Sequence, residues 1–216
     1  MFGDFRAGWT DGAATVWVGG PDTKQRVTGS GPPAAVAALV DRLMPELPAT
    51  AWFSLPQGSA GGLAAQRAVV RINDWELRWL ATAPPAPPDM TEWLPGDSAE
   101  VGALIDSAYP EAEARPGDLE VRGWMAFRGD AGELVAAAAD TSGAATGRIS
   151  AVMTAPAVRG RGYGAAVTSA LCRKMLTEFD LVILGLYLHN DQARRLYRRI
   201  GFRDAQIVTS GKWTAQ

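Results

Sequence analysis

One segment constrains the fold more than any other: a strand pattern at residues 147–155, a loop with three glycines, and an amphipathic helix pattern reaching about Phe179. The loop reads "RGRGYG" from Arg159 to Gly164, so small residues alternate with two arginines and a tyrosine. Glycine allows positive φ and a close approach of the backbone to a ligand. A strand joined to a helix by such a loop indicates an α/β domain with a ligand site at the helix N-terminus.

Three interpretations of this loop are open. It can be a helix start that happens to be rich in glycine. It also matches the dinucleotide pattern G-x-G-x-x-G/A, with Asp180 20 residues past Gly160; however, Pro156 and three more residues separate the strand from Gly160, and Asp180 precedes the next strand instead of ending it. Thirdly, free N–H groups beside Arg159 and Arg161 can hold a pyrophosphate. No G-K-[ST] follows, which excludes a Walker loop.

Strand and helix patterns alternate on both sides of this segment, which predicts an α/β fold with a mixed sheet. The helix patterns cover residues 32–47, 97–109 and 190–202. Asp97 or Ser98 is the expected cap of the second of these helices, and Gly201 ends the third. The strand patterns cover residues 14–20, 50–56, 75–82, 90–97, 123–130, 132–141, 181–188 and 202–213, with a hairpin expected across residues 129–132.

A proline-rich segment, "TAPPAPPDM" at residues 82–90, divides the chain. Such a sequence favours an extended spacer. We therefore predict a smaller α/β half at residues 1–84, a linker at 85–89, and a complete domain at 90–216.

Composition excludes several functions. The net charge is −2, which argues against nucleic-acid and anionic-membrane binding. Cys172 is the single cysteine, and no stretch approaches 18 apolar residues, so we expect a reduced, cytoplasmic protein without a membrane segment. No His/Cys cluster has metal-ligand spacing, and no metal is expected. With 21 basic residues of which three are lysine, the chain is typical of a GC-rich bacterial genome.

Two motifs in this order resemble the GNAT superfamily of acyl-CoA-dependent N-acyltransferases. The first is Arg159-x-x-Gly162-x-Gly164 after a strand, and the second is the series Asn190, Ala193, Leu196-Tyr197 and Gly201-Phe202. The resemblance covers residue 90 to about residue 213. It implies a sheet that is splayed between two central strands and flanked by helices. By pattern alone, residues 1–84 are similar to a degenerate GNAT half that lacks a phosphate loop.

The resemblance also implies a site for acetyl-CoA. The pantetheine arm is expected to pair with the strand at residues 147–155 and to contact Asn190. The expected cofactor-binding residues are Val152, Met153, Thr154, Arg159, Gly160, Arg161, Gly162, Tyr163, Gly164, Ala165 and Asn190.

Tyr197 is the expected catalytic residue, because the matching tyrosine in many members protonates the departing CoA thiolate. The alternative is a core tyrosine. The general base stays open: Ser150 stands where a carboxylate can occur, which leaves water, a backbone carbonyl, Asp140, or the single histidine, His189. Cys172 is expected to be a buried hydrophobe.

The implied reaction is direct attack by a primary amine of a small molecule or peptide on acetyl-CoA. Tyr109 and Trp124 are the expected walls of the acceptor site. The missing carboxylate at Ser150 keeps a second hypothesis open, a non-catalytic acyl-CoA-binding or sensor module. Neither the acceptor nor the oligomeric state follows from the sequence.

Overall fold

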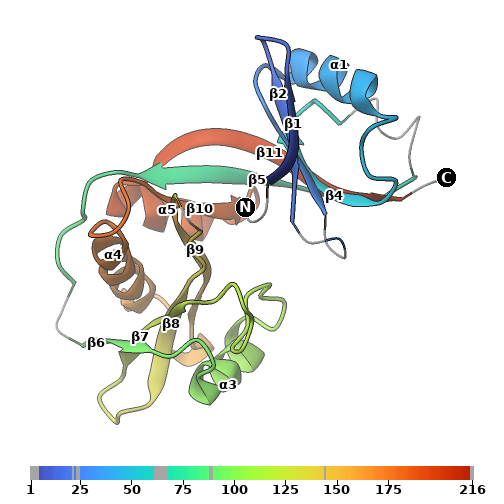
Figure 1. The fold of residues 1–216 in the computed structure, drawn as a ribbon. Coiled ribbons are helices and arrows are strands. Elements are labelled where there is room, and N and C mark those ends of the chain that lie inside the picture. The colour runs from blue at the N-terminus through green and yellow to red at the C-terminus, as the bar shows by residue number, and fades with distance from the viewer. Residues whose placement is uncertain are drawn as a thin grey trace. The chain divides into compact units, whose positions relative to one another are not determined.

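The computed structural model describes residues 5–20, 22, 25–60, 68–87, 90–143 and 145–214, without the side chains of residues 70–72 and 205. The chain forms two compact units (Figure 1). Unit 1 comprises Met1–Leu77, Leu186–His189 and Ala205–Gln216, and unit 2 comprises Arg78–Gly185 and Asn190–Asp204. Among the described residues, no helix is long and apolar enough to cross a membrane.

The described residues of unit 1 form a mixed sheet with helix α1, Pro33–Leu43, against it. Its strands are hydrogen-bonded in the order β1-β2-β3-β4-β11-β5, and their bounds are Phe5–Thr10, Thr15–Gly19, Arg26–Ser30, Ala51–Pro56, Arg203–Thr214 and Ala68–Leu80. Helix α1 connects the parallel strands β3 and β4. It buries Val36, Leu39, Val40 and Leu43, the apolar positions of its helical pattern, which confirms the predicted helix.

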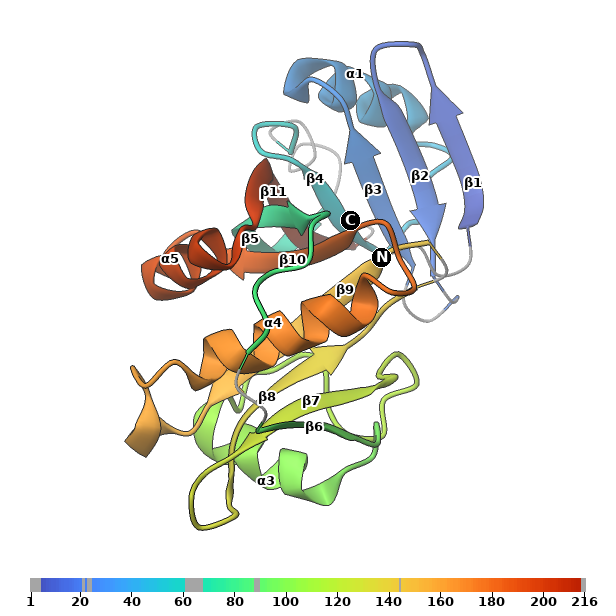
Figure 2. The same ribbon diagram turned by 90° about the vertical axis from the view of Figure 1, so that its left-hand side faces the viewer.

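Unit 2 has the strand order β10-β9-β8-β7-β6, with bounds Val182–Tyr187, Gly147–Thr154, Leu134–Asp140, Gly123–Arg128 and Thr91–Leu94. Its helices are α3, Ala99–Ala108, α4, Tyr163–Met175, and α5, Asp191–Ile200. Strands β7 and β8 form the predicted hairpin. In Figure 2, α4 crosses one face of strands β7 to β9 and α3 lies on the other. Both units together confirm the predicted mixed α/β fold class.

The compact units differ from the predicted segments, because unit 2 begins at Arg78 and unit 1 includes Leu186–His189 and Ala205–Gln216. Strand β11 pairs antiparallel with β4 from Val208↔Pro56 to Trp213↔Ala51, and it therefore belongs largely to unit 1. Trp213 is completely buried there and stacks on Phe53 at 5.4 Å between ring centroids. This burial favours the distant pairing. Of the predicted linker, residues 85–87 are described without regular structure, and residues 88–89 lie outside the described part.

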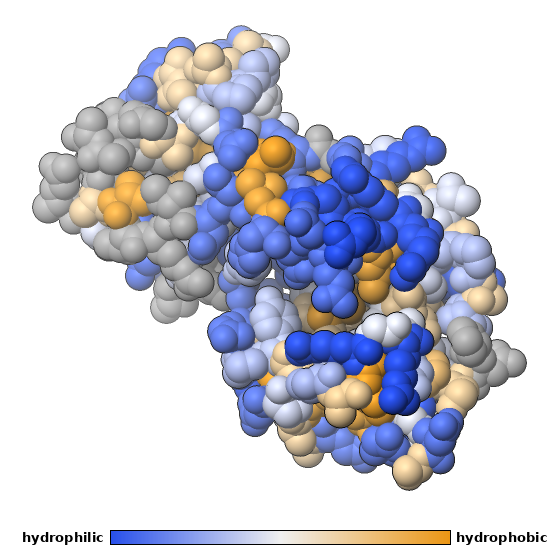
Figure 3. All heavy atoms as spheres, turned by 180° about the vertical axis from the view of Figure 1, so that it is seen from behind, coloured by the Kyte–Doolittle hydropathy of each residue, from blue (hydrophilic) through white to orange (hydrophobic). Residues whose placement is uncertain are grey.

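Large exposed apolar side chains occur singly along the described chain: Phe5, Met90, Trp93, Leu119 and Ile207. The face drawn in Figure 3 is mostly hydrophilic, with apolar surface in separate small areas. Scattered apolar residues of this kind are normal on a folded protein and do not define a binding surface.

Gly123, at the start of β7, lies under the Trp93 ring. A Cβ there would approach Trp93 Cζ2 to 2.2 Å and the Leu94 carbonyl oxygen to 2.9 Å. Gly123→Ala should therefore lower the free energy of unfolding by about 1–3 kcal/mol, as overpacking does. Thermal denaturation measures the change, with a fall of about 5 °C expected for a chain of this length.

Gly102→Ala is the matched control for this substitution. Gly102 lies inside α3, and its Cβ would meet only Pro116 Cγ at 3.9 Å, an ordinary contact. Alanine is the better helix former, so this variant should gain up to about 1 kcal/mol. Equal melting temperatures for Gly123→Ala and the wild-type protein would contradict the proposed steric conflict.

Candidate active site

The parallel ladder between β9 and β10 ends early. The two strands pair only at Gly147↔Val182, Arg148↔Ile183 and Ile149↔Leu184. On its other side β9 stays paired with β8 up to Thr154, with a register shift at Ala137–Ala139. Ala151 has φ 46°, an unusual value for a residue with a side chain. From residue 150 onward, β9 therefore presents an edge to which an extended ligand can add as a strand.

After β9, the chain forms a 3₁₀ turn at Pro156–Val158 and then the glycine loop. Gly160 and Gly162 have φ 82° and 91°, and Gly162 is the N-cap of α4. The first helical hydrogen bond runs from Ala166 N to the Gly162 carbonyl at 3.0 Å. In the described part of the chain, the N–H groups from Gly160 to Ala165 have no protein acceptor. Because they sit at the positive end of the helix dipole, they form an anion cradle.

Gly164 has a different role from the other two glycines. A Cβ at this position would lie 3.2 Å from Thr154 Oγ1 and 3.6 Å from Leu196 Cδ1. Its small size thus lets the first turn of α4 lie close to the end of β9 and to α5. Tyr163, beside it, packs its ring on Phe127 with 4.8 Å between centroids. Of Tyr163, it is therefore the backbone that takes part in the cradle.

The two arginines of the loop, both predicted to add charge for a phosphate, differ in their contacts. Arg159 donates from Nε to the Thr154 carbonyl at 3.2 Å and from Nη2 to the Ala108 carbonyl at 3.0 Å. Two of its nitrogens thus donate to backbone carbonyls at the ends of β9 and α3, and the side chain is exposed. Arg161 is exposed, and among the described residues it has no ion-pair or hydrogen-bond partner.

Asn190 and Tyr197 lie on α5. Asn190 is exposed and caps the helix, with Oδ1 accepting a hydrogen bond from Ala193 N at 3.0 Å. Its carboxamide N–H₂ is not used in that cap. Tyr197 is buried, and its ring meets Phe202 edge-on at 5.7 Å. Burial raises the pKa of the Tyr197 phenol, which therefore stays neutral and able to donate a proton.

The structure places Trp124 and Tyr109, the two residues expected to line the acceptor site, in different surroundings. Trp124 is completely buried in the core between α3 and the sheet, and its indole N–H donates to the Gly96 carbonyl at 3.1 Å. It has no surface to offer an acceptor, so the structure places it in the core instead of a binding wall. Tyr109 caps the C-terminus of α3 and is half-buried against the same core.

The residues considered for the general base differ in their surroundings: Ser150 and Asp140 have polar partners, whereas His189 is exposed. Ser150 Oγ lies 2.7 Å from Thr141 Oγ1 in a hydrogen bond. Asp140 is buried, pairs with Arg122 at 3.6 Å and accepts from Ser142 N at 2.9 Å. His189 is exposed and stacks on Tyr187.

Cys172 is buried, as expected, and burial raises the pKa of its thiol to about 12, which keeps it un-ionised. Among the described residues there is no group of His, Cys, Asp or Glu side chains placed to hold a metal.

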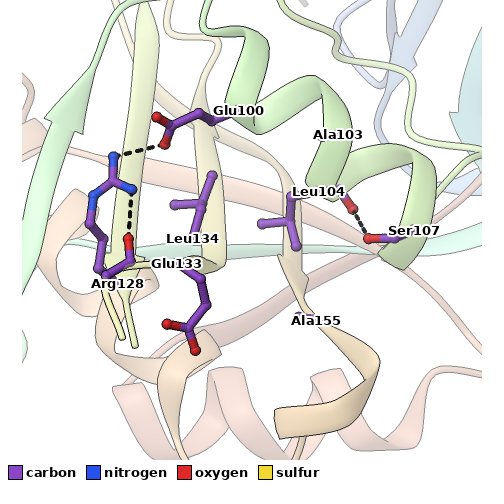
Figure 4. Close-up of a pocket in the computed structure, with 9 residues that line it drawn as sticks. Glu100, Ala103, Leu104, Ser107, Arg128, Glu133, Leu134 and Ala155 are labelled. Atoms are coloured by element: carbon purple, nitrogen blue, oxygen red, sulfur yellow. Dashed lines mark hydrogen bonds and ion pairs between the residues drawn. The ribbon is translucent and has the colours of Figure 1, made fainter. Parts of the chain in front are cut away.

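A hollow of about 520 Å³ lies between α3 and the β7–β8 hairpin, and no sequence pattern indicated it. Figure 4 shows Arg128 reaching Glu100 across its rim, at 2.8 Å. Arg128 also pairs with Glu92 at 2.5 Å. The hollow is lined by Glu100, Ala103, Leu104, Ser107, Arg128, Gly132, Glu133, Leu134 and Ala155. These residues come from three segments that are far apart in the sequence, so no local spacing of residues could predict the hollow.

The fold matches solved acetyltransferases of the GNAT family. A putative GNAT acetyltransferase from Novosphingobium aromaticivorans is 23% identical, with a TM-score of 0.61 over 88% of this chain and 84% of that one. A GCN5-related N-acetyltransferase from Kribbella flavida is 21% identical, with a TM-score of 0.58 over 98% and 90%. A tandem GNAT protein from the clavulanic acid biosynthesis pathway is 16% identical, with a TM-score of 0.51 over 96% and 80%.

The fold is thus that of the solved GNAT proteins to which the chain is similar. Residues 126–211 match the family described as FR47-like protein. This match covers the C-terminal part of the chain, and the chain shares its fold with solved GNAT proteins.

Proposed function

We propose that this protein transfers an acetyl group from acetyl-CoA to a primary amine of a small molecule or peptide. The observation that carries the proposal is the position of the anion cradle. The N–H groups of Gly160–Ala165, which have no acceptor among the described residues, come one 3₁₀ turn after the strand whose free edge begins at Ser150. A ligand with an extended amide-containing arm and a pyrophosphate at its end matches both features, and acyl-CoA has this chemistry.

In this proposal, backbone groups of Val152, Met153 and Thr154 hydrogen-bond the pantetheine arm as an added strand would. The cradle holds the pyrophosphate through N–H groups and the helix dipole. Arg161 adds a screened charge, and the carboxamide N–H₂ of Asn190 contacts the arm.

The chemical step is nucleophilic attack by the neutral amine on the thioester carbonyl in a ternary complex. A backbone N–H of β9 stabilises the negative oxygen of the tetrahedral intermediate. When the intermediate collapses, the C–S bond breaks, and Tyr197 donates its proton to the thiolate. We assign removal of the amine proton to water, because Ser150 carries no carboxylate and Asp140 is ion-paired.

For residues 1–84 we propose a degenerate GNAT half without acyl-CoA binding. The element series β1-β2-β3-α1-β4 repeats the pairing of β7-β8-β9-α4-β10: two antiparallel pairs, then a helix connecting two parallel strands. Unlike α4, α1 begins at Pro32-Pro33. Prolines have no N–H, so this helix start offers fewer donors to an anion. The fold match to a tandem GNAT protein agrees with this proposal.

A non-catalytic acyl-CoA sensor is the second candidate, favoured by the absence of a carboxylate at Ser150. Calorimetry with CoA, followed by thiol release from acetyl-CoA with a panel of amines, separates the two. We expect CoA binding together with thiol release that depends on at least one amine. Binding without turnover across the panel supports the sensor, and absence of CoA binding refutes both.

A further inference from the structure

Arg159 is the first residue of the glycine-loop motif, yet its side chain donates hydrogen bonds to two backbone carbonyls outside the loop. The geometry points to Arg159 as a positioning residue that ties the end of α3, and so Tyr109, to the end of β9, while Arg161 supplies the loop's charge. This inference rests on the proposed function, in which the cradle holds a pyrophosphate. It assigns to Arg159 a role in positioning the site of the amine acceptor, and to Arg161 a role in phosphate binding.

The two hydrogen bonds of Arg159 join elements that are far apart in the sequence. The Thr154 carbonyl belongs to the last residue of β9, and the Ala108 carbonyl to the last residue of α3, 51 positions before Arg159. Carbonyls in the last turn of a helix lack partners within the helix. A guanidinium there satisfies one of them and interacts favourably with the negative end of the helix dipole.

Tyr109 follows Ala108 directly, so its backbone is held from both sides. Its N–H donates to the Ile105 carbonyl at 2.8 Å, and its own carbonyl accepts from Ala112 N at 3.0 Å. The ring is half-buried against the core that contains Met153. Movement of the α3 end would therefore displace a side chain near the proposed reacting groups.

Arg161, unlike Arg159, makes no hydrogen bond or ion pair with another described residue. It stands between Gly160 and Gly162, both with positive φ, on the exposed part of the loop. Among the described residues its charge is not neutralised by any partner. A cation in this setting attracts an anion through a screened, salt-dependent interaction.

Arg159→Met and Arg161→Met form a matched pair, since each removes one charge and keeps a long side chain. Calorimetry with CoA at 50 and 300 mM NaCl compares them. Arg161→Met should weaken binding about fivefold at low salt and less at high salt, as for an exposed charge pair. Arg159→Met should change the Kd less than about twofold at either salt concentration, because its donors serve backbone carbonyls.

Hydrogen exchange over residues 105–112 tests the tether itself. Exchange should rise in Arg159→Met and stay unchanged in Arg161→Met, because only the former releases the end of α3. With an amine that the protein acetylates, Arg159→Met should raise the acceptor KM about tenfold, because release of the α3 end misplaces Tyr109 at the acceptor site. The KM for acetyl-CoA should stay unchanged. Arg159→Gln keeps one amide donor and should recover part of both effects.

The opposite pattern overturns the inference. If Arg159→Met weakens CoA binding with the salt dependence of Arg161→Met and leaves exchange at 105–112 unchanged, Arg159 is a phosphate ligand. If the wild-type protein binds no CoA, the proposed function fails, and unchanged exchange in Arg159→Met then refutes the tether separately.

Discussion

Gly162→Asp is expected to weaken CoA binding by at least about 100-fold. Gly162 is the N-cap of α4 with φ 91°, and nothing lies within 4 Å of its missing Cβ, so a side chain would project from the cradle into open space. A carboxylate there would take up the unpartnered N–H groups and repel a pyrophosphate. Like charges in such a site cost several kcal/mol, and each 1.4 kcal/mol is about a factor of ten in Kd.

Two control variants separate charge from backbone strain. Gly162→Asn has nearly the same shape, is tolerated in the left-handed region, and carries no charge, so it should bind CoA much more tightly than Gly162→Asp. Gly117→Asp introduces aspartate at another glycine with φ 88° and open surroundings. It should show a similar loss of stability, about 1–2 kcal/mol, with unchanged CoA affinity. Calorimetry and thermal denaturation give both quantities. Equal CoA affinity for Gly162→Asp and the wild-type protein refutes the cradle as a phosphate site.

Tyr197→Phe is expected to lower kcat by about 100-fold, the low end for a positioned general acid. Because burial keeps the phenol un-ionised above its ordinary pKa of 10.0, no loss of this acid is expected between neutral pH and pH 10. CoA affinity should stay nearly the same, since only one hydroxyl is removed and the ring can still pack on Phe202. The loss should be smallest with acyl donors whose thiol has a low pKa, because such a thiolate leaves without protonation.

Tyr187→Phe is the matched control for Tyr197→Phe. Tyr187 is a half-buried tyrosine on β10 that stacks on His189, and its loss of a hydroxyl should leave kcat within about twofold. Measuring kcat and melting temperature on one preparation of each variant separates catalysis from stability. If Tyr197→Phe loses about 1 kcal/mol of stability but is fully active per folded molecule, Tyr197 is a core residue and not the acid.

Much of this protein follows from local sequence. The helical spacing of apolar residues predicted α1, α3, α4 and α5, and alternation with turn residues predicted the β7–β8 hairpin. The glycine loop could be located as an anion cradle because positive φ and helix-start N–H groups are properties of a few adjacent residues. Strands β1 and β3 were not predicted, since both are short and β3 reads "RVTGS", with little apolar alternation.

Other features depend on residues that meet only in the folded chain. The sequence placed Trp124 at an acceptor wall, but packing of α3 against the sheet buries it. It gave no sign that Arg159 donates a hydrogen bond to the Ala108 carbonyl, 51 positions away. Pairing of β11 with β4 and the early end of the β9–β10 ladder likewise arise from contacts between distant segments. Local patterns determine which segments form helices, strands and the glycine loop, whereas side-chain direction and strand partners are decided by burial and hydrogen bonding across the whole tertiary structure.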